Sequence, residues 1–181
     1  GLETFGIDAA GLVAIDVGAS TGGFTDVLLH GGAARVHAVD VGYGQLAEKL
    51  RHDPRVAVHE RVNARSLGPA EVPEPVDLVV CDASFVGLRL VLPAALSLAA
   101  PGAHLAALIK PQFELQPGQV GKGGIVKDEA LYAVVEKRIR DCCADLGLAV
   151  RGWYDSAIEG GDGNREFFVH ATKNQDKEEG A

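Results

Sequence analysis

The segment Leu12-Val-Ala-Ile-Asp16-Val-Gly18-Ala-Ser20-Thr21-Gly22-Gly23-Phe24 decides the fold. Its first five residues form a short apolar run that ends in an acid, a pattern typical of a buried strand. The glycines that follow favour a tight turn, because glycine adopts backbone conformations that other residues avoid. Phe24, Val27 and Leu28 then recur at helical spacing. The segment therefore predicts a strand, a glycine-rich turn and a helix.

The same alternation continues along the chain. Leu46 and Leu50 mark a second helix, and the apolar stretch Leu88–Ala100 predicts another that Pro101-Gly102 stops. A later helix over Asp128–Leu146 has one apolar face. The last two β-rich runs are joined by a glycine-rich loop without a helix, so we expect them to pair antiparallel. The expected strands are Leu12–Asp16, Arg35–Asp40, Val56–His59, Val76–Cys81, His104–Ile109, Ala149–Tyr154 and Phe167–Ala171.

Five strand–helix units that end in a hairpin predict an α/β fold. We expect a doubly wound sheet of seven strands that is mostly parallel, with one antiparallel strand and helices on both faces. The length of 181 residues suits one domain, expected at residues 1–172, followed by a polar and disordered tail at 173–181. The chain begins at Gly1 and contains no methionine, so we expect a piece of a longer product.

Composition restricts the possible partners. Lys and Arg total 17 against 25 Asp and Glu, a formal net charge of -8. This balance argues against a chain that holds a phosphate backbone over its whole surface, but it suits a catalytic module whose RNA grip is supplied elsewhere. Cys81, Cys142 and Cys143 show no metal-ligand spacing and indicate a reduced, cytoplasmic protein. No apolar run reaches the roughly 20 residues of a membrane span, and we expect no signal peptide.

The glycine-rich turn lies where a nucleotide-like ligand binds in this architecture. Asp40 follows the second strand, and an acid there can accept hydrogen bonds from two ribose hydroxyls. Either feature alone is ambiguous, since the turn could be only a turn and Asp40 could only cap a loop. Together they favour an adenosine cofactor. No Gly-Lys-Ser/Thr follows, which excludes a P-loop, and Ser20 replaces the second glycine of the dinucleotide pattern. Asn63 is a candidate for reading an adenine edge.

A second group of polar residues lies at strand ends. Asp82 ends the fourth strand, Lys110 ends the fifth, and Glu166 opens the last. Ligands of an open parallel sheet bind at the carboxyl ends of its strands, so these side chains should face the cofactor crevice. The plain alternative is one ion pair at a sheet rim. Bulky apolar neighbours in Asp82-Ala-Ser-Phe85 and Leu108-Ile-Lys110-Pro-Gln-Phe113 favour a substrate slot instead.

These motifs resemble the TlyA-type proteins, which are FtsJ-like ribosomal RNA ribose 2′-O-methyltransferases that are often labelled hemolysins. The resemblance rests on five segments in the same order along nearly the whole chain. They are Gly18-Ala-Ser-Thr-Gly-Gly-Phe-Thr-Asp26, Asp40-Val-Gly-Tyr-Gly-Gln45, Cys81-Asp-Ala-Ser-Phe85, Lys110-Pro-Gln-Phe-Glu114 and Gly163-Asn-Arg-Glu-Phe167.

The resemblance implies a Rossmann-like class I fold that binds S-adenosylmethionine (SAM), and a Lys-Asp-Lys-Glu catalytic tetrad. Asp82, Lys110 and Glu166 match its last three members. The first lysine should lie shortly before Gly1, because this chain has no lysine until Lys49. The RNA-binding S4-type domain that such proteins carry at their N-terminus is also expected upstream. The expected cofactor contacts are Asp16, Gly18, Ser20, Thr21, Gly22, Phe24, Asp40, Val41, Asn63 and Asp82.

The chemistry assigns Lys110 a definite task. A ribose hydroxyl is a poor nucleophile at neutral pH, so it needs a base or a cation where oxyanion charge develops. The pKa of a lysine must fall by roughly 3 for it to act as a base near pH 7. Asp82 and Glu166 oppose that change, which the first lysine would offset. With these three residues alone, Lys110 should stay charged and steer rather than catalyse.

Three functions are therefore considered. The first is SAM-dependent methyl transfer to a ribose 2′-hydroxyl of ribosomal RNA, alone or within a ribosomal subunit. The second is a module that binds SAM and RNA without turnover. The third, a membrane-active hemolysin, is disfavoured because the chain is acidic and has neither a spanning segment nor a strongly basic amphipathic helix.

Overall fold

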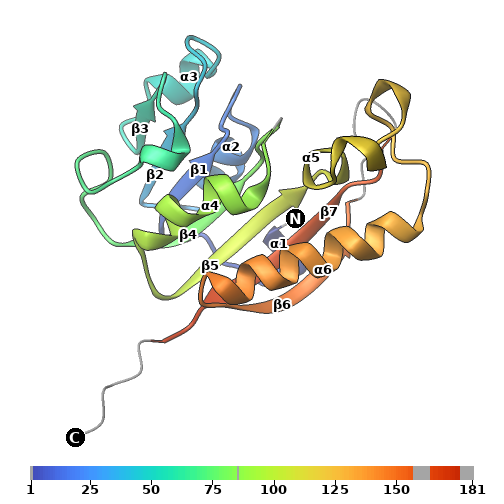
Figure 1. Ribbon diagram of the computed structural model, residues 1–181. Coiled ribbons are helices and arrows are strands. Elements are labelled where there is room, and N and C mark those ends of the chain that lie inside the picture. Colours follow the sequence, from blue (N-terminus) through green and yellow to red (C-terminus); the bar gives the residue numbers. More distant parts are fainter. Residues whose placement is uncertain (1, 85, 157–163, 176–181) are drawn as a thin grey trace, which may run out of the picture.

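The computed structural model describes residues 2–84, 86–156 and 164–175, and its centre is a seven-stranded sheet (Figure 1). The strand order is β3-β2-β1-β4-β5-β7-β6. Strands β1 to β5 pair in parallel, and β7 runs antiparallel to both β5 and β6. The expected sheet with one antiparallel strand is confirmed. The strands are β1 (Val13–Val17), β2 (Arg35–Val39), β3 (Val56–His59), β4 (Val76–Cys81), β5 (Ala99–Ile109), β6 (Leu148–Asp155) and β7 (Phe167–Lys173).

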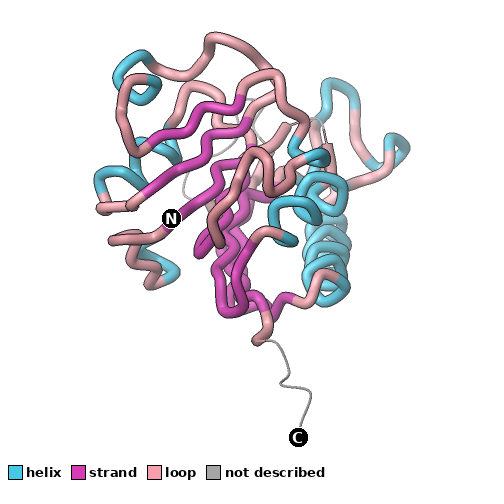
Figure 2. Tube along the Cα trace, turned by 90° about the vertical axis from the view of Figure 1, so that its left-hand side faces the viewer, coloured by secondary structure: helices cyan, strands magenta, loops and turns pink. Residues whose placement is uncertain are grey.

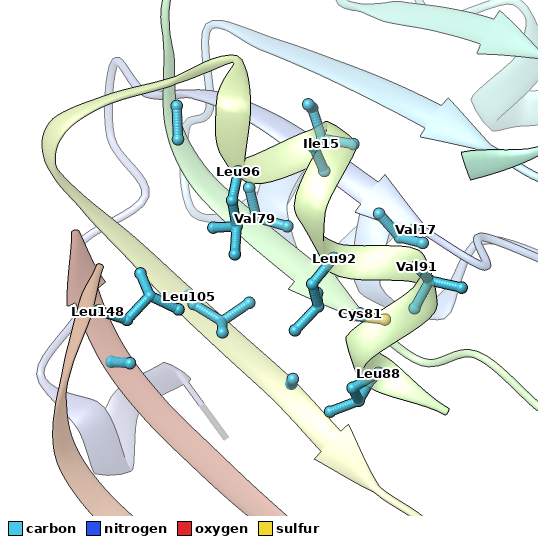
Figure 3. Packing of buried hydrophobic residues seen from close by; sticks show 14 of the residues in the cluster. Ile15, Val17, Val79, Cys81, Leu88, Val91, Leu92, Leu96, Leu105 and Leu148 are labelled. Atoms are coloured by element: carbon cyan, nitrogen blue, oxygen red, sulfur yellow. The ribbon is translucent and has the colours of Figure 1, made fainter. Parts of the chain in front are cut away.

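Helices cover both faces of this sheet (Figure 2). On one face, α4 and α6 pack over a core that includes Ile15, Val79 and Leu105, and Figure 3 shows the α4 side chains in this layer. On the other face, α2 and α3 pack on Ala14, Val36 and Leu78. The helices are α1 (Leu2–Phe5), α2 (Gly23–His30), α3 (Glu48–Arg51), α4 (Leu88–Ser97), α5 (Pro111–Glu114) and α6 (Ala130–Asp145), with 3₁₀ turns η1 (Ala64–Ser66), η2 (Pro117–Gln119) and η3 (Lys122–Gly124).

Burial explains why β1 and β4 lie in the middle. Their residues Ala14, Ile15, Val79 and Val80 are fully buried, since a central parallel strand has a helix layer on each face. The parallel order also brings the carboxyl ends of β1, β2, β4 and β5 to one edge of the sheet. Every candidate functional segment lies at that edge or beside it.

Two sequence expectations need correction. The helix expected over Leu88–Ala100 ends at Ser97, and β5 already begins at Ala99. Pairing of Val76 with Ala99 is followed by pairing of Leu78 with His104, so Pro101-Gly102 lies in an irregular excursion inside the strand and does not stop a helix. The five strand–helix units are also too many, because only the 3₁₀ turn η1 lies between β3 and β4.

The C-terminal boundary falls inside β7. The strand extends to Lys173, whose ammonium donates to the backbone carbonyls of Leu96 and Ala99 at 2.9 and 2.7 Å. The domain boundary expected at residue 172 therefore cuts the strand one residue before its end. Residues 176–181 of the expected disordered tail lie outside the described residues. None of the helices in the described part of the chain has the length and apolarity needed to cross a membrane.

Candidate active site

The glycine-rich turn brings the ends of β1, β2 and β4 into contact. The amide of Gly18 donates to the carbonyl of Val39 at 2.9 Å, and the backbone of Gly18 has a positive φ of 77°. A Cβ atom at this position would collide with the backbone of Asp82. Gly22, at φ 103°, packs against the side-chain ends of Leu46 and Leu50. Both positions favour glycine for backbone conformation, and Gly18 requires it also for space, which leaves the turn close to the end of β4.

Asp40 is held by backbone amides. Its Oδ2 accepts a hydrogen bond from the Ser20 amide at 2.8 Å, and its Oδ1 accepts one from the Gly42 amide at 2.8 Å. Each carboxylate oxygen keeps a second lone pair, so two further hydroxyl donors can be accepted. A small hollow beside it is lined by Ala19, Ser20, Ala38, Asp40, Gly42, Gln45, Leu46, Val58 and Glu60. The turn therefore fixes the carboxylate that we expect to bind the ribose.

The loop after Asp40 exposes two large apolar side chains beside this hollow. Val41 is 72% exposed and Tyr43 is 69% exposed. The guanidinium of Arg61 lies 4.5 Å from the centre of the Tyr43 ring. Asn63 stands further along the chain, where its Oδ1 accepts from the amide of Arg65 at 3.0 Å and caps η1. This capping contact gives Asn63 a local structural task, and the adenine contact stays a prediction.

Asp16 lies beneath the turn and is fully buried. Its Oδ2 accepts a hydrogen bond from the hydroxyl of Thr25 at 2.8 Å, while no described group bonds its Oδ1. Burial raises the pKa of this carboxyl to about 6, and the nearby carboxylates of Asp82 and Asp40 act in the same direction. Three acids thus converge at the ends of β1, β2 and β4. This concentration of negative charge favours a positively charged ligand.

A larger cleft of about 650 Å³ joins the turn to the far strands of the sheet. It combines apolar and aromatic walls with the carboxylates of Asp82 and Glu166. Phe24 and Phe168 meet edge to face across it, with ring centres 6.4 Å apart. The cleft is lined by Phe5, Gly18, Ala19, Ser20, Thr21, Gly23, Phe24, Val27, Asp82, Leu108, Tyr154, Asp155, Ser156, Glu166 and Phe168.

Lys110 meets two side chains at the rim of the sheet. Its ammonium lies 2.6 Å from Asp82 Oδ1 and donates to the hydroxyl of Ser84 at 2.8 Å. Only 15% of the lysine side chain is exposed. Ile109 pairs with Phe167 in the antiparallel ladder, so continuing the register by one residue sets Lys110 opposite Glu166. The structure therefore brings Asp82 and Lys110 into contact, and it places Asp82 and Glu166 along the same cleft.

Two further polar residues belong to this region. Ser84 lies inside the segment Asp82-Ala-Ser-Phe85, whose position after a strand could have identified it. Asn164 is 99% buried and bonds the segment 124–126. Its sequence signals are its place two residues before Glu166 and its presence in the segment Gly163-Asn-Arg-Glu-Phe167. The sequence assigns a role to neither residue, because both act through contacts between segments far apart in the chain.

The fold and the site together define a class. The FtsJ-like methyltransferase family model matches residues 1–173, so the chain belongs to the FtsJ-like family. Its fold is the Rossmann-like fold of SAM-dependent methyltransferases. A SAM-dependent methyltransferase from Mesorhizobium loti superposes with a TM-score of 0.70 at 14% identity, covering 95% of each chain.

Closer relatives narrow this class. The chain is 51% identical over 168 residues to the 16S/23S rRNA (cytidine-2′-O)-methyltransferase TlyA of Mycobacterium tuberculosis. That match covers 93% of this chain and 63% of the relative. A solved structure of a candidate hemolysin from Streptococcus thermophilus gives a TM-score of 0.92 at 41% identity, covering 96% of this chain and 63% of that one. The chain therefore spans somewhat less than two thirds of these relatives.

Proposed function

We propose that this domain transfers a methyl group from SAM to a ribose 2′-hydroxyl of ribosomal RNA. The observation that carries the proposal is the Lys110–Asp82 pair, which lies opposite Glu166 beside the cleft that the glycine-rich turn also lines. The relationship to a ribosomal RNA 2′-O-methyltransferase supports the same substrate. Ribosomal RNA as substrate implies work in the cytoplasm.

The chain's residues fit SAM. The fixed carboxylate of Asp40 suits the ribose hydroxyls, and the cleft that the glycine-rich turn lines leaves room for the methionine part over residues 18–22. The cofactor carries a positive sulfonium and a positive ammonium, which suit the convergence of Asp16, Asp40 and Asp82. When bound, SAM supplies an electrophilic methyl group. Contacts of Thr21, Phe24, Val41 and Asn63 with it are part of this proposal.

Lys110 would engage the substrate hydroxyl. Its ammonium is fixed by Asp82 and Ser84, so it can polarise a 2′-oxygen and stabilise the negative charge that develops there, while the carboxylate of Glu166 in the same cleft accepts the hydroxyl proton as the methyl group is transferred. Asp82 orients the lysine, and Glu166 approaches from the opposite strand. Positioning accounts for most of the rate in such a displacement. We also propose that a second lysine upstream of Gly1 completes the catalytic group, and that an upstream S4-type domain supplies most of the RNA affinity.

Tritiated methyl transfer to ribosomal subunits tests this function. We would compare this chain, a version extended upstream, and the Lys110→Ala variant of the extended version, with Lys137→Ala on the exposed face of α6 as the matched control. Methylation of the 2′-oxygen also protects the adjacent linkage from alkali, which identifies the modified group. SAM binding without methyl transfer by the extended protein would favour the binding module. Transfer to a base instead of a ribose would refute the proposal.

A further inference from the structure

Asn164 is a buried amide that joins two distant segments. Only 1% of the surface of Asn164 is exposed to solvent. The Oδ1 atom accepts from the Val126 amide at 2.9 Å, and the Nδ2 atom donates to the Gly124 carbonyl at 2.8 Å. One side chain therefore reproduces the donor and acceptor pair that a neighbouring strand would offer. A buried amide satisfied at both ends specifies one arrangement strongly, because a shifted arrangement would leave polar groups unpaired.

Both joined segments are next to a candidate catalytic residue in the chain. One follows Lys110 and the other contains Glu166. Residues 111–126 leave the sheet directly after Lys110, at the edge where α5 lies in Figure 1. Their near end is fixed by the pairing of Ile109 with Phe167. Their far end is fixed by Asn164, two residues before Glu166. This excursion from the sheet is thus pinned at both ends to the start of β7.

The far end of the excursion needs such an anchor. Gly123 and Gly124 have positive φ angles of 76° and 78°, and Gly121 donates to the Ile125 carbonyl at 2.8 Å. This tight, glycine-rich turn carries the exposed cations Lys122 and Lys127 on either side of the anchored residues. Glycine has more backbone freedom to lose than any other residue, so the turn depends on the contacts that hold it.

Asn164 is joined to the acid through the chain and to the lysine-bearing turn through hydrogen bonds. Glu166 follows Asn164 by two residues and lines the cleft. The intervening Arg165 pairs with Asp155 at 2.7 Å and lies 5.1 Å from the centre of the Tyr132 ring. A displacement of Asn164 would therefore move Glu166 and the lysine-bearing turn relative to each other.

We infer that Asn164 is a positioning residue for methyl transfer. It fixes the turn with Lys122 and Lys127 relative to Lys110 and Glu166, so that RNA phosphates held by the turn align the target ribose with the reacting groups. The inference rests on the proposed function. It predicts that loss of the anchor impairs the use of RNA without affecting SAM binding, because Asp40 and the glycine-rich turn follow β2 and β1, which β4 and β5 separate from β7.

The test compares three variants of the full-length protein. Asn164→Ala removes both hydrogen bonds, and Asn164→Asp keeps the acceptor for Val126 while losing the donor to Gly124. Asn174→Ala makes the same chemical change at an exposed position beyond the other end of β7. We would measure kcat and the KM for ribosomal RNA at saturating SAM, the Kd of SAM, and hydrogen exchange of the Val126 amide.

For Asn164→Ala we expect kcat/KM for RNA to fall at least about tenfold, since small misplacements of reacting groups are costly. The Kd of SAM should stay within about twofold of wild type, and the Val126 amide should exchange faster. Asn164→Asp should fall between wild type and alanine, and Asn174→Ala should match wild type.

A folded Asn164→Ala protein with wild-type kcat and KM would overturn the inference, as would an equal loss of SAM binding. If Asn164→Ala does not fold, a wild-type kcat/KM in Asn164→Asp overturns it. A wild-type protein that methylates no RNA would refute the proposed function, and the inference with it.

Discussion

Asp40 and Lys110 stand at the ends of two strands of one sheet, yet they are held in different ways. The carboxylate of Asp40 accepts from two backbone amides, at Ser20 and Gly42. The ammonium of Lys110 is held by two side chains, those of Asp82 and Ser84. The Ser20 and Asp40 partners come from the ends of two adjacent strands, β1 and β2, just as the partners of Lys110 come from the end of β4. The cofactor side is thus held by the backbone of its turns, whereas the substrate side is held by side chains.

This difference predicts separable effects on binding and turnover. The Lys110→Ala substitution should have the largest effect and should act on turnover alone. In the full-length protein we expect methyl transfer to fall at least about a hundredfold, the low end of what a positioned proton-transfer group contributes. The Kd of SAM should change little, the signature of an interaction made in the transition state. Single-turnover methylation with calorimetric SAM titration measures both, and a matched loss of SAM affinity would show that the two sides are not separable.

The raised pKa of Asp16 can be tested through the pH dependence of the free energy of unfolding. Its pKa is about 6 in the folded protein against a usual 3.8, so the folded state binds the proton more tightly than the unfolded state. Its contribution to stability is therefore fully present below pH 3.8 and is lost as the pH rises through 6. The cost by pH 7.5 is about 3 kcal/mol as an upper bound. Asp16→Asn should remove this cost, so the stability difference between variant and wild type should grow from pH 4 to pH 7.5.

Urea unfolding of both proteins without cofactor at the two pH values measures that difference. The comparison cancels the other titrating groups, which the variant shares with wild type. A difference independent of pH would show that Asp16 is ionised throughout and that a group on the cofactor side compensates its burial. A stabilised variant that binds SAM more weakly would show that this carboxylate is kept for its charge, at the expense of stability.

The next prediction concerns the effect of the Asp40 carboxylate on SAM affinity. Asp40→Ala should weaken SAM binding by about 1.5–3 kcal/mol, the cost of losing hydrogen bonds to a charged acceptor. It also releases the amides of Ser20 and Gly42, so part of the loss would reflect a looser turn. Asp141→Ala, at an exposed position on α6, is the control. Calorimetry that finds an unchanged SAM affinity in Asp40→Ala would remove this residue from the cofactor site.

The same contrast explains what the sequence could predict. The strand ends and the glycine-rich turn are local patterns, so the sheet and the positions of Asp40, Asp82 and Lys110 followed from spacing. Helix α4 was overextended because Leu98, Ala99 and Ala100 suit a helix as well as a strand, and only pairing with β4 decides between them. The roles of Asn164 and Ser84 could not be predicted because their hydrogen-bond partners lie 26 to 40 residues away in the chain. Partners at that separation leave no periodic signal.

The smallest effect should appear in RNA binding by this chain alone. A net charge of -8 leaves few places to neutralise phosphates, and the local cations are Lys122 and Lys127 in the anchored turn. We expect weak binding to ribosomal RNA fragments and a shallow dependence on salt, with a log–log slope of magnitude about 2 for two phosphate contacts. Replacing both lysines by alanine should reduce that slope by about 1 for each lysine lost. Fluorescence anisotropy between 50 and 200 mM salt measures these slopes. Submicromolar binding at physiological salt, or a slope unchanged in the double variant, would show that another surface of this domain holds the RNA. The substrate side would then depend less on an upstream RNA-binding domain.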